Sequence, residues 1–373
     1  ASILIGNGDG TFQPRIDIDT YDPGELETIA ALQVRIADFN GDGWNDIALG
    51  IQSGDLGNPG IGILLNDGAG NFSGYPTLYA FSTQLRGLEV ADMTGDGELD
   101  LIYANRDDNT INIVPGNGDG TFQTEIFATF TGGPVGVAIA DYNNDGHLDV
   151  AAPLVFSSEI VIATGNSDGS LTEFARFSAD GPEGIAVGDI NGDGFEDLTT
   201  PYLNGDAVQF FLGNGDGTFG AKQSISTGAS SLPIAIALGD TNNDGFDDIH
   251  AGLFLANAVK VLRRKGEMTV IDTATLAVID AVDTGHPAAN AGASADGSVI
   301  SFASPGADGI VVIREANDCL ADTNGDGMVS PADFSAWVAQ FNSNGPLCDQ
   351  NDDGMCTAAD FSAWVGNYNA GCN

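Results

Sequence analysis

The chain has 373 residues, of which 53 are Asp or Glu and only 11 are Lys or Arg, so its formal net charge is −42 at pH 7. This excess of negative charge argues against nucleic acid and anionic lipid surfaces as partners, because both would repel the protein. No apolar run approaches the roughly 18 residues that a membrane-spanning helix requires, so membrane insertion is not expected.

A nine-residue acidic loop recurs five times, beginning at Asp38, Asp92, Asp141, Asp189 and Asp240. Every copy has an oxygen-bearing side chain at positions 1, 3, 5 and 9 and glycine at position 6. Oxygen donors on alternate residues, with a glycine that allows a tight bend, are what Ca²⁺ requires. The predicted side-chain ligands are Asp38, Asn40, Asp42, Asp46, Asp92, Thr94, Asp96, Asp100, Asp141, Asn143, Asp145, Asp149, Asp189, Asn191, Asp193, Asp197, Asp240, Asn242, Asp244 and Asp248.

Position 7 of these loops varies, as expected where only the main-chain carbonyl is used. The predicted carbonyl donors are Trp44, Glu98, His147, Phe195 and Phe246. The alternative is that Asp, Asn and Gly merely mark turns. Five matched copies favour calcium, because a turn does not need several carboxylates that would repel one another without a cation. The second site should be the weakest, since Thr94 replaces a stronger oxygen donor.

The sequence around each loop predicts the fold. A short apolar run precedes the third loop at 136–140, another follows it at 148–152, and similar third runs, such as 111–114, end in a glycine-rich turn. This turn is written GNGDGTF at 6–12, 116–122 and 213–219, with looser versions at 66–72 and 165–171. One unit therefore has about four short strands, too few to bury a core alone, and repetition near every fifty residues predicts a β-propeller of six or seven blades.

The GNGDG turn superficially resembles a phosphate-binding loop. It joins strand to strand, however, and offers no helix N-terminus to hold an anion. The polar residues of the turns are therefore expected to be hairpin-turn residues rather than ligands. They are Asn7, Asp9, Asn117, Asp119, Asn214 and Asp216.

These units resemble FG-GAP or VCBS repeats, the calcium-loop blades of integrin-α-like propellers. The resemblance covers roughly residues 1–255, where loop, strands and turn recur in the family's order. Residues 256–316 lack the acidic loop and resemble a calcium-free YVTN-type blade instead. The chain opens in a third strand, so we expect either that these N-terminal strands complete the last blade or that the sequence is a fragment. The propeller is assigned to residues 1–316.

A different acidic loop appears twice near the C-terminus, as DTNGDGMVSPAD from Asp322 and DQNDDGMCTAAD from Asp349. Its spacing is that of an EF-hand, with Asp in place of the usual Glu at position 12. The predicted side-chain ligands are Asp322, Asn324, Asp326, Ser330, Asp333, Asp349, Asn351, Asp353, Thr357 and Asp360, and the carbonyl donors are Met328 and Met355. Five propeller sites and two C-terminal sites for Ca²⁺ are thus predicted.

Each C-terminal loop leads into a short predicted helix, with Ser330 or Thr357 at the N-cap. Two such halves resemble a type I dockerin, and the closing Gly371 and Cys372 resemble the GC-type dockerin-like domains of Planctomycetes. The resemblance implies a small α-helical, calcium-folded docking domain at 317–373, whose partner is a cohesin-like or envelope protein. Positions 10 and 11, such as Pro331, lack the hydroxyls often found there, which argues against a cellulosomal cohesin.

All four cysteines lie in this C-terminal domain: Cys319, Cys348, Cys356 and Cys372. A domain this small commonly needs metals or disulfides for stability. Two disulfides in an oxidising compartment are favoured over a thiolate metal site, because no CxxC pair supports zinc. Three pairings remain open. The protein is therefore expected to be secreted or at the cell surface.

Composition and motifs favour a secreted, calcium-binding, non-catalytic recognition or adhesion protein. Its propeller face would bind an extracellular glycan or protein, and its dockerin-like domain would attach to a partner. One alternative is a calcium-dependent polysaccharide lyase or hydrolase, but side chains for acid–base chemistry are few, and His147, His250 and His286 are weak candidates. Another alternative is a structural envelope protein. No catalytic residue is predicted.

Overall fold

The computed structural model describes residues 2–3, 16–17, 30–52, 60–68, 71–72, 77–79, 85–240, 246–254, 258–264, 271–274, 290–293, 299–303 and 310–314. The chain divides into two compact units, Ala1–Ile3 with Ile16–Ile313, and Leu4–Arg15 with Arg314–Asn373. All described residues but one belong to the first unit, and the architecture below is that of this unit.

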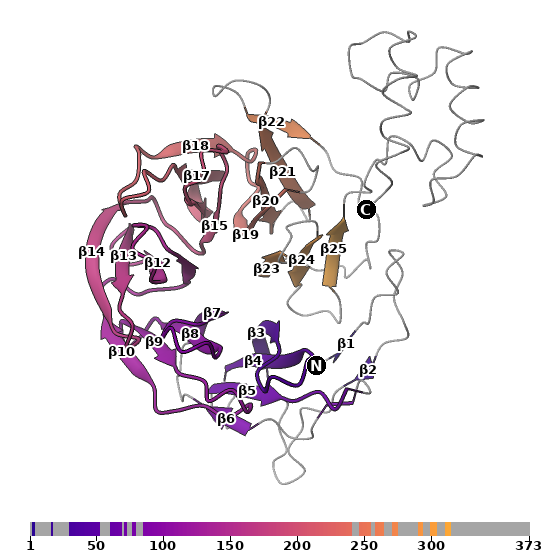
Figure 1. Ribbon diagram of the computed structural model, residues 1–373. Coiled ribbons are helices and arrows are strands. Elements are labelled where there is room, and N and C mark those ends of the chain that lie inside the picture. Colours follow the sequence, from indigo (N-terminus) through magenta and orange to yellow (C-terminus); the bar gives the residue numbers. More distant parts are fainter. Residues whose placement is uncertain are drawn as a thin grey trace, which may run out of the picture. The chain divides into compact units, whose positions relative to one another are not determined.

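Within the described residues, five antiparallel sheets of four strands follow one another along the chain (Figure 1). The first two consist of β3 (Ala30–Ala37), β4 (Asp46–Gln52), β5 (Gly60–Leu64) and β6 (Thr77–Tyr79), and of β7 (Leu85–Ala91), β8 (Asp100–Asn105), β9 (Thr110–Val114) and β10 (Ile126–Thr129). The third consists of β11 (Ala138–Ala140), β12 (Asp149–Leu154), β13 (Glu159–Gly165) and β14 (Leu171–Ser178).

The fourth sheet consists of β15 (Ala186–Gly188), β16 (Asp197–Tyr202), β17 (Ala207–Phe211) and β18 (Gln223–Ser226), with the short 3₁₀ helix η1 (Leu203–Gly205) between its second and third strands. The fifth consists of β19 (Pro233–Gly239), β20 (Asp248–Leu253), β21 (Ala258–Arg264) and β22 (Ile271–Ala274). A three-stranded sheet, β23 (Asn290–Ala293), β24 (Val299–Ala303) and β25 (Ile310–Arg314), and the pair β1 (Ser2–Ile3) and β2 (Ile16–Asp17) complete the described strands.

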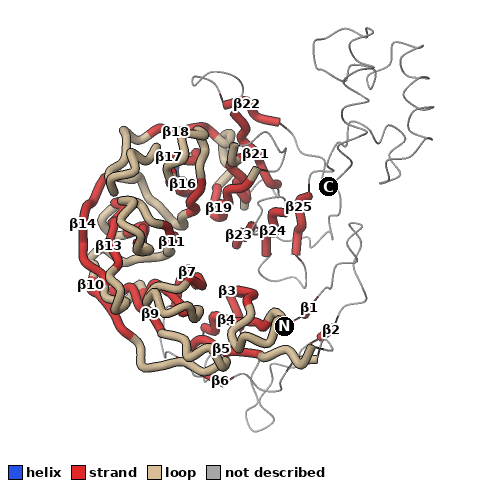
Figure 2. The backbone as a smooth tube through the Cα atoms, in the orientation of Figure 1, coloured by secondary structure: helices blue, strands red, loops and turns tan. Residues whose placement is uncertain are grey.

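The first strands of successive sheets lie next to one another. β3 contacts β7, β7 contacts β11, and the series continues through β15 and β19 to β23. Figures 1 and 2 show the last strands, such as β10 and β14, on the outer side of the sheets. The described part of the chain is thus mostly β, and its sheets are arranged as propeller blades, as the repeat period predicts. The number of blades and the role of the N-terminal strands stay predictions.

The core lies between adjacent sheets. The second strands β8, β12 and β20 are buried at every position. Because both faces of such a strand are covered, most of its residues are apolar instead of alternating with polar ones, as in 150–154 of β12. Between the first two sheets, for example, Ile61, Leu85 and Leu101 pack together fully buried. Each such side chain contributes roughly 1.5–3 kcal/mol to folding.

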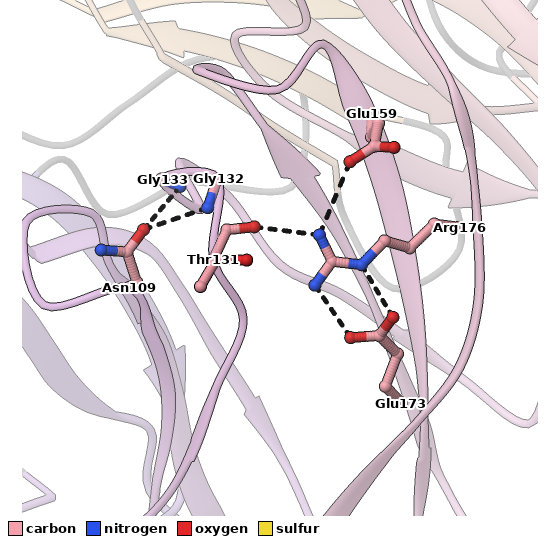
Figure 3. A network of polar contacts seen from close by, with 7 residues as sticks. All are labelled: Asn109, Thr131, Gly132, Gly133, Glu159, Glu173 and Arg176. Carbon is pink, nitrogen blue, oxygen red and sulfur yellow. Dashed lines mark hydrogen bonds and ion pairs between the residues drawn. The ribbon is translucent and has the colours of Figure 1, made fainter.

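Arg176 on β14 ties the third sheet to the segment that leads into it (Figure 3). Its guanidinium donates two bonds of 2.8 Å to Glu173 and one of 2.9 Å to the carbonyl of Thr131, and it lies 3.5 Å from Glu159. Nearby, the side-chain oxygen of Asn109 accepts bonds of 3.1 and 3.0 Å from the amides of the two glycines after Thr131. Polar side chains therefore position the connection between the second and third sheets.

Several predictions concern residues that the structure does not describe. Both C-terminal calcium loops, at 322–333 and 349–360, lie outside the described residues, as do the helices expected after them and all four cysteines. The proposed disulfides and the dockerin-like domain therefore stay predictions. Among the described residues, no helix is long and apolar enough to cross a membrane.

Candidate metal centres

Each acidic loop joins the first strand of a sheet to the second. Four loops, at 38–46, 92–100, 141–149 and 189–197, are described throughout. In the fifth, residues 241–245 lie outside the described residues, and with them the predicted ligands Asn242 and Asp244. The geometry of the acidic loop is therefore defined by the four loops that are described completely.

The first Asp of each loop organises the loop around itself. One carboxylate oxygen accepts a hydrogen bond from the amide of the position 6 glycine. The pairs are Gly43 to Asp38, Gly97 to Asp92, Gly146 to Asp141 and Gly194 to Asp189, at 2.7, 2.9, 2.8 and 2.8 Å. In all four loops the other oxygen accepts the position 5 amide at 3.1–3.2 Å. The amide of Gly43 in particular lowers the pKa of the Asp38 carboxyl.

Glycine is required at position 6 because its φ lies between +85° and +91° in all four loops. This left-handed conformation costs other residues energy and lets the chain turn back toward its first Asp. The position 5 carboxylates also turn inward, and each accepts the amide of position 7 at 2.9 Å. The side chains at positions 1 and 5 thus face the inside of the same bend.

Position 3 distinguishes the second loop from the others. In the other three loops an Asn side-chain oxygen accepts the amide of position 5, as Asn40 does from Asp42 at 3.0 Å. The equivalent Thr94 hydroxyl oxygen is buried and has no hydrogen-bond partner in the described structure. A buried oxygen without a partner lowers the free energy of unfolding unless a bound ion or water supplies the missing contact.

The Asp at position 9 is buried in every loop, and four of the five are fully inaccessible. One oxygen of Asp46 accepts the amide of Phe39 in the same loop at 3.0 Å, and the other accepts the amide of Asn66 in the hairpin turn at 2.7 Å. Asp100, Asp149 and Asp197 repeat this arrangement. The position 9 carboxylate thus joins the acidic loop to the hairpin turn of its own sheet, a role that spacing alone did not indicate.

The amide hydrogen bonds of these buried carboxylates do not fully offset the effect of burial on their pKa values. Burial raises the pKa of the Asp197 carboxyl to about 7, although the amides of Gly213 and Ile190 lower it. Burial also raises the pKa values of Asp100 and Asp149. A divalent cation beside such a group would offset the cost of burying its charge.

The donor chemistry of the loops fits a calcium ion. Each loop brings three carboxylates, an Asn or Thr oxygen and a main-chain carbonyl into nine residues, all of them hard oxygen donors. In the described residues, no group of three or more Asp, Glu, His or Cys side chains is already arranged around a metal position. The carboxylates are instead turned toward the amides of their own loops.

The side chain at position 7 has a role that the sequence did not reveal. A Cβ atom on Gly68 would lie 2.6 Å from the indole nitrogen of Trp44, and one on Gly215 would lie 2.3 Å from the ring of Phe195. In the first, second and fourth sheets the side chain at position 7 therefore covers a glycine of the hairpin turn in the same sheet, whereas Phe246 of the fifth loop lies against Gly192 of the fourth loop. Glycine is required in the hairpin turn for two reasons: a side chain would collide with the residue at position 7, and the φ of the glycine is positive. The recurring second glycine of GNGDG was the only available signal.

The GNGDGTF turns are hairpin turns, as predicted. The amide of Asn117 donates to the carbonyl of Thr121 at 3.0 Å, and a carboxylate oxygen of Asp119 accepts the amide of Thr121 at 2.9 Å. Asn214 and Asp216 make the same contacts in the fourth sheet. The hairpin role is thus confirmed for these four residues, while Asn7 and Asp9 lie outside the described residues.

Acidic loops also contact the hairpin turn of the following sheet. The carbonyl of Phe39 in the first loop accepts the amide of Gly120 from the second sheet at 2.9 Å, and its ring lies edge-on to Phe122 at 5.8 Å between centroids. Tyr142 and Phe219 repeat the ring contact between the third and fourth sheets at the same separation. Changes in a loop should therefore be felt in two sheets.

Comparisons with known proteins agree with these repeats. The family model described as the FG-GAP-like repeat matches residues 38–103, 92–152 and 202–251. The chain therefore carries FG-GAP-like repeats in its propeller region, and the matched segments contain four of the five acidic loops. No curated protein matches the chain. The match does not extend to the C-terminal domain, whose dockerin-like character and Planctomycetes affinity stay predictions.

Solved structures resemble the chain in fold. A lectin of Agrocybe aegerita, described as recognising non-reducing terminal N-acetylglucosamine, is 22% identical, with 73% of each chain covered and a TM-score of 0.51. A protein of Lactobacillus plantarum is 16% identical, with 73% of this chain and 79% of that chain covered and a TM-score of 0.55. A gluconolactonase of Xanthomonas campestris is 14% identical, with coverages of 72% and 82% and a TM-score of 0.46. At such identities the likeness concerns the fold alone.

Proposed function

We propose that this chain is a secreted, calcium-binding, non-catalytic recognition or adhesion protein whose propeller binds a glycan or a protein. The observation that carries the calcium part is the common geometry of the four described loops. In each, the first Asp is held by the glycine amide at position 6, and a buried carboxylate stands at position 9.

In each loop the side chains at positions 1, 3, 5 and 9 and the carbonyl at position 7 would hold the ion. Calcium would supply positive charge where three carboxylates otherwise repel one another. Since the loops contact the hairpin turns of their own and of following sheets, bound ions would stiffen the assembly of sheets. The C-terminal sites from Asp322 and Asp349 would do the same for the dockerin-like domain.

The recognition part rests on the likeness of fold and on the loops between strands. One similar fold belongs to a protein described as a lectin, and FG-GAP-like repeats form the matched part of this chain. Propellers place ligands on the loops at one end of their sheets, and such loops are present here at 105–110 and 203–207. The dockerin-like domain would attach the propeller to an envelope or scaffold partner.

The proposal is tested with the calcium-loaded full chain on a panel of acidic and neutral polysaccharides, following retention and product release together. Retention without products is expected. New chain ends that disappear with EDTA would overturn the non-catalytic proposal in favour of a polysaccharide lyase or hydrolase. A calcium titration by calorimetry tests the ion sites separately, with dissociation constants of about 0.1–1 mM expected for extracellular sites of this kind.

A further inference from the structure

A cavity of about 480 Å³ lies among the first strands of the five four-stranded sheets. Residues of β3, β7 and β19 line it, together with the segments that lead into β11 and β15. Its volume falls in the range of small-molecule sites, roughly 300–1,000 Å³. The cavity is separate from the acidic loops, none of whose residues lines it.

The cavity gathers positive charge in an otherwise acidic protein. Arg35, Arg86 and Arg106 line it, three of the 11 basic residues of a chain whose net charge is −42. Only Glu89 and Glu183 among the lining residues carry negative charge. The composition of the wall is therefore the reverse of the composition of the chain.

These charges are unequally satisfied. Arg35 forms a two-bond ion pair with Glu89, which completes that pair within the protein. The side chain of Arg86 makes no hydrogen bond or ion pair within the described structure, and its Nε is buried without a partner. Glu183 likewise has no hydrogen bond or ion pair there. Leaving a buried charged donor unpaired costs free energy, which a ligand could recover.

Arg86 and Glu183 come from different sheets, the second and the fourth, and influence each other without touching. Burial lowers the pKa of Arg86, as does the neighbouring Arg106, whereas Glu183 raises it. Burial raises the pKa of Glu183, while Arg86 and Arg106 lower it. Arg106 also bonds its neighbour Asp107 at 3.2 Å. One group that binds anions and one that accepts hydrogen bonds therefore face the same cavity.

Backbone irregularities position these side chains. The pairing of β7 with β8 shifts register between Arg86 and Glu89, so both residues line the cavity although they are three apart in a strand. Without the bulge they would point to opposite faces. Gly87, inside the bulge, has φ +54°, and a Cβ there would lie 2.5 Å from the Cα of Gly136 in the next sheet.

An aromatic ring borders the cavity. Phe156 is 71% exposed although it is a large apolar residue. A Cβ on Gly133 would lie 2.4 Å from this ring, and the amide of Phe156 donates to the carbonyl of Gly132 at 2.8 Å. Asn109 in turn holds the amides of both glycines (Figure 3). This largely exposed ring at the edge of the cavity is suitable for stacking against an apolar ligand surface.

We infer that this cavity binds a small carboxylate that carries hydroxyl groups, the class to which sugar acids belong. Its carboxylate would bond Arg86 with help from Arg106, a hydroxyl would donate to Glu183, and its C–H face would rest on Phe156. Phosphate dianions fit less well because Glu183 repels a second negative charge. Amino acids also fit less well, since their ammonium group would lie in the field of two guanidiniums. The inference rests on the proposed recognition function and names the ligand class.

The test is calorimetric titration of the calcium-loaded full chain with galacturonate, galactose, inorganic phosphate and alanine. Galacturonate is expected to bind at least about tenfold more tightly than the other three. Arg86→Gln should weaken it at least about tenfold, as loss of one charged hydrogen-bonding group predicts. Lys222→Gln, which removes a cation that pairs with Asp180 and does not line the cavity, should change it less than about twofold. Circular dichroism checks folding, and Arg106→Gln replaces Arg86→Gln if that variant does not fold.

Equal binding of galactose, phosphate or alanine would overturn the inference, as would unchanged galacturonate binding by Arg86→Gln and by Arg106→Gln. The variants also separate the cavity from uronate held by calcium, because they leave the acidic loops intact. If galacturonate does not bind while polysaccharide retention persists, this inference fails and the proposed function stands. Galacturonate binding by a chain that binds no calcium would instead support the cavity and refute the calcium proposal.

Discussion

The acidic loops and the cavity lined by Arg86 hold charge in opposite ways. In the loops, charges of one sign accept hydrogen bonds from amides of the same sheet, many of them only a few residues away, as Asp38 does from the amide of Gly43. In the cavity, charges of both signs arrive from different sheets, and Arg86 has no partner in the described structure. Local partners make a site that repeats with the sequence, whereas distant partners make one that occurs once. The predictions below test the loops against this contrast.

Removal of calcium should have the largest effect. At millimolar calcium each site would contribute roughly 1–1.5 kcal/mol, so chelation should lower stability by several times that amount. Differential scanning calorimetry with and without EDTA measures it, and added calcium should restore the original melting temperature. We expect the C-terminal domain to unfold first. Identical melting in EDTA would contradict the calcium proposal.

Asp100→Ala should have the next largest effect. The change leaves the amides of Met93, Thr94 and Gly116 without their acceptor inside the protein. We expect a loss of about 2–4 kcal/mol, even in EDTA, because this role needs no ion. Urea unfolding measures the loss.

The matched control is Asp119→Ala, which removes an exposed turn carboxylate and should leave stability nearly unchanged. If the two variants were equally stable, the buried bonds of Asp100 would not matter for folding.

Gly215→Ala should be moderately destabilising, by about 1–2 kcal/mol. Its φ of +71° disfavours a side chain, and the new methyl would meet Phe195. The control is Gly220→Ala, where φ is not positive and the nearest atom is 3.5 Å away. Thermal unfolding of the two variants in parallel gives the difference, and equal melting temperatures would show that position 7 does not constrain the turn.

Thr94→Asn should have the smallest effect and the opposite sign. It gives the second loop the amide oxygen found at position 3 of the other described loops, in place of a buried hydroxyl without a partner. Calcium titration should then show a several-fold tighter second site, with little change in calcium-free stability. Weaker binding would mean that the second loop is built differently from its neighbours.

Much of the loop geometry could be predicted because it is local. Positions 1 and 6 of the loop bond each other, and the GNGDGTF turn makes its own bonds, all within a few residues. The pattern that recurs in the sequence therefore recurs in space. The hydrogen bond from the amide of Asn66 in the hairpin turn to Asp46 spans 20 residues and could not be read from spacing. The cavity was missed altogether, because Arg35, Arg86 and Arg106 occupy no repeated position and the bulge at Gly87 leaves no pattern.

The bond between Gly120 and Phe39, with the ring contact beside it, has a consequence for anyone who recombines these repeats. A unit cut at its apparent sequence boundary carries one half of two different interfaces. Phe39 should be exchanged together with Phe122, and Tyr142 with Phe219. A graft that moves only one member of a pair would disrupt the ring contact between adjacent sheets, even if every acidic loop were copied intact.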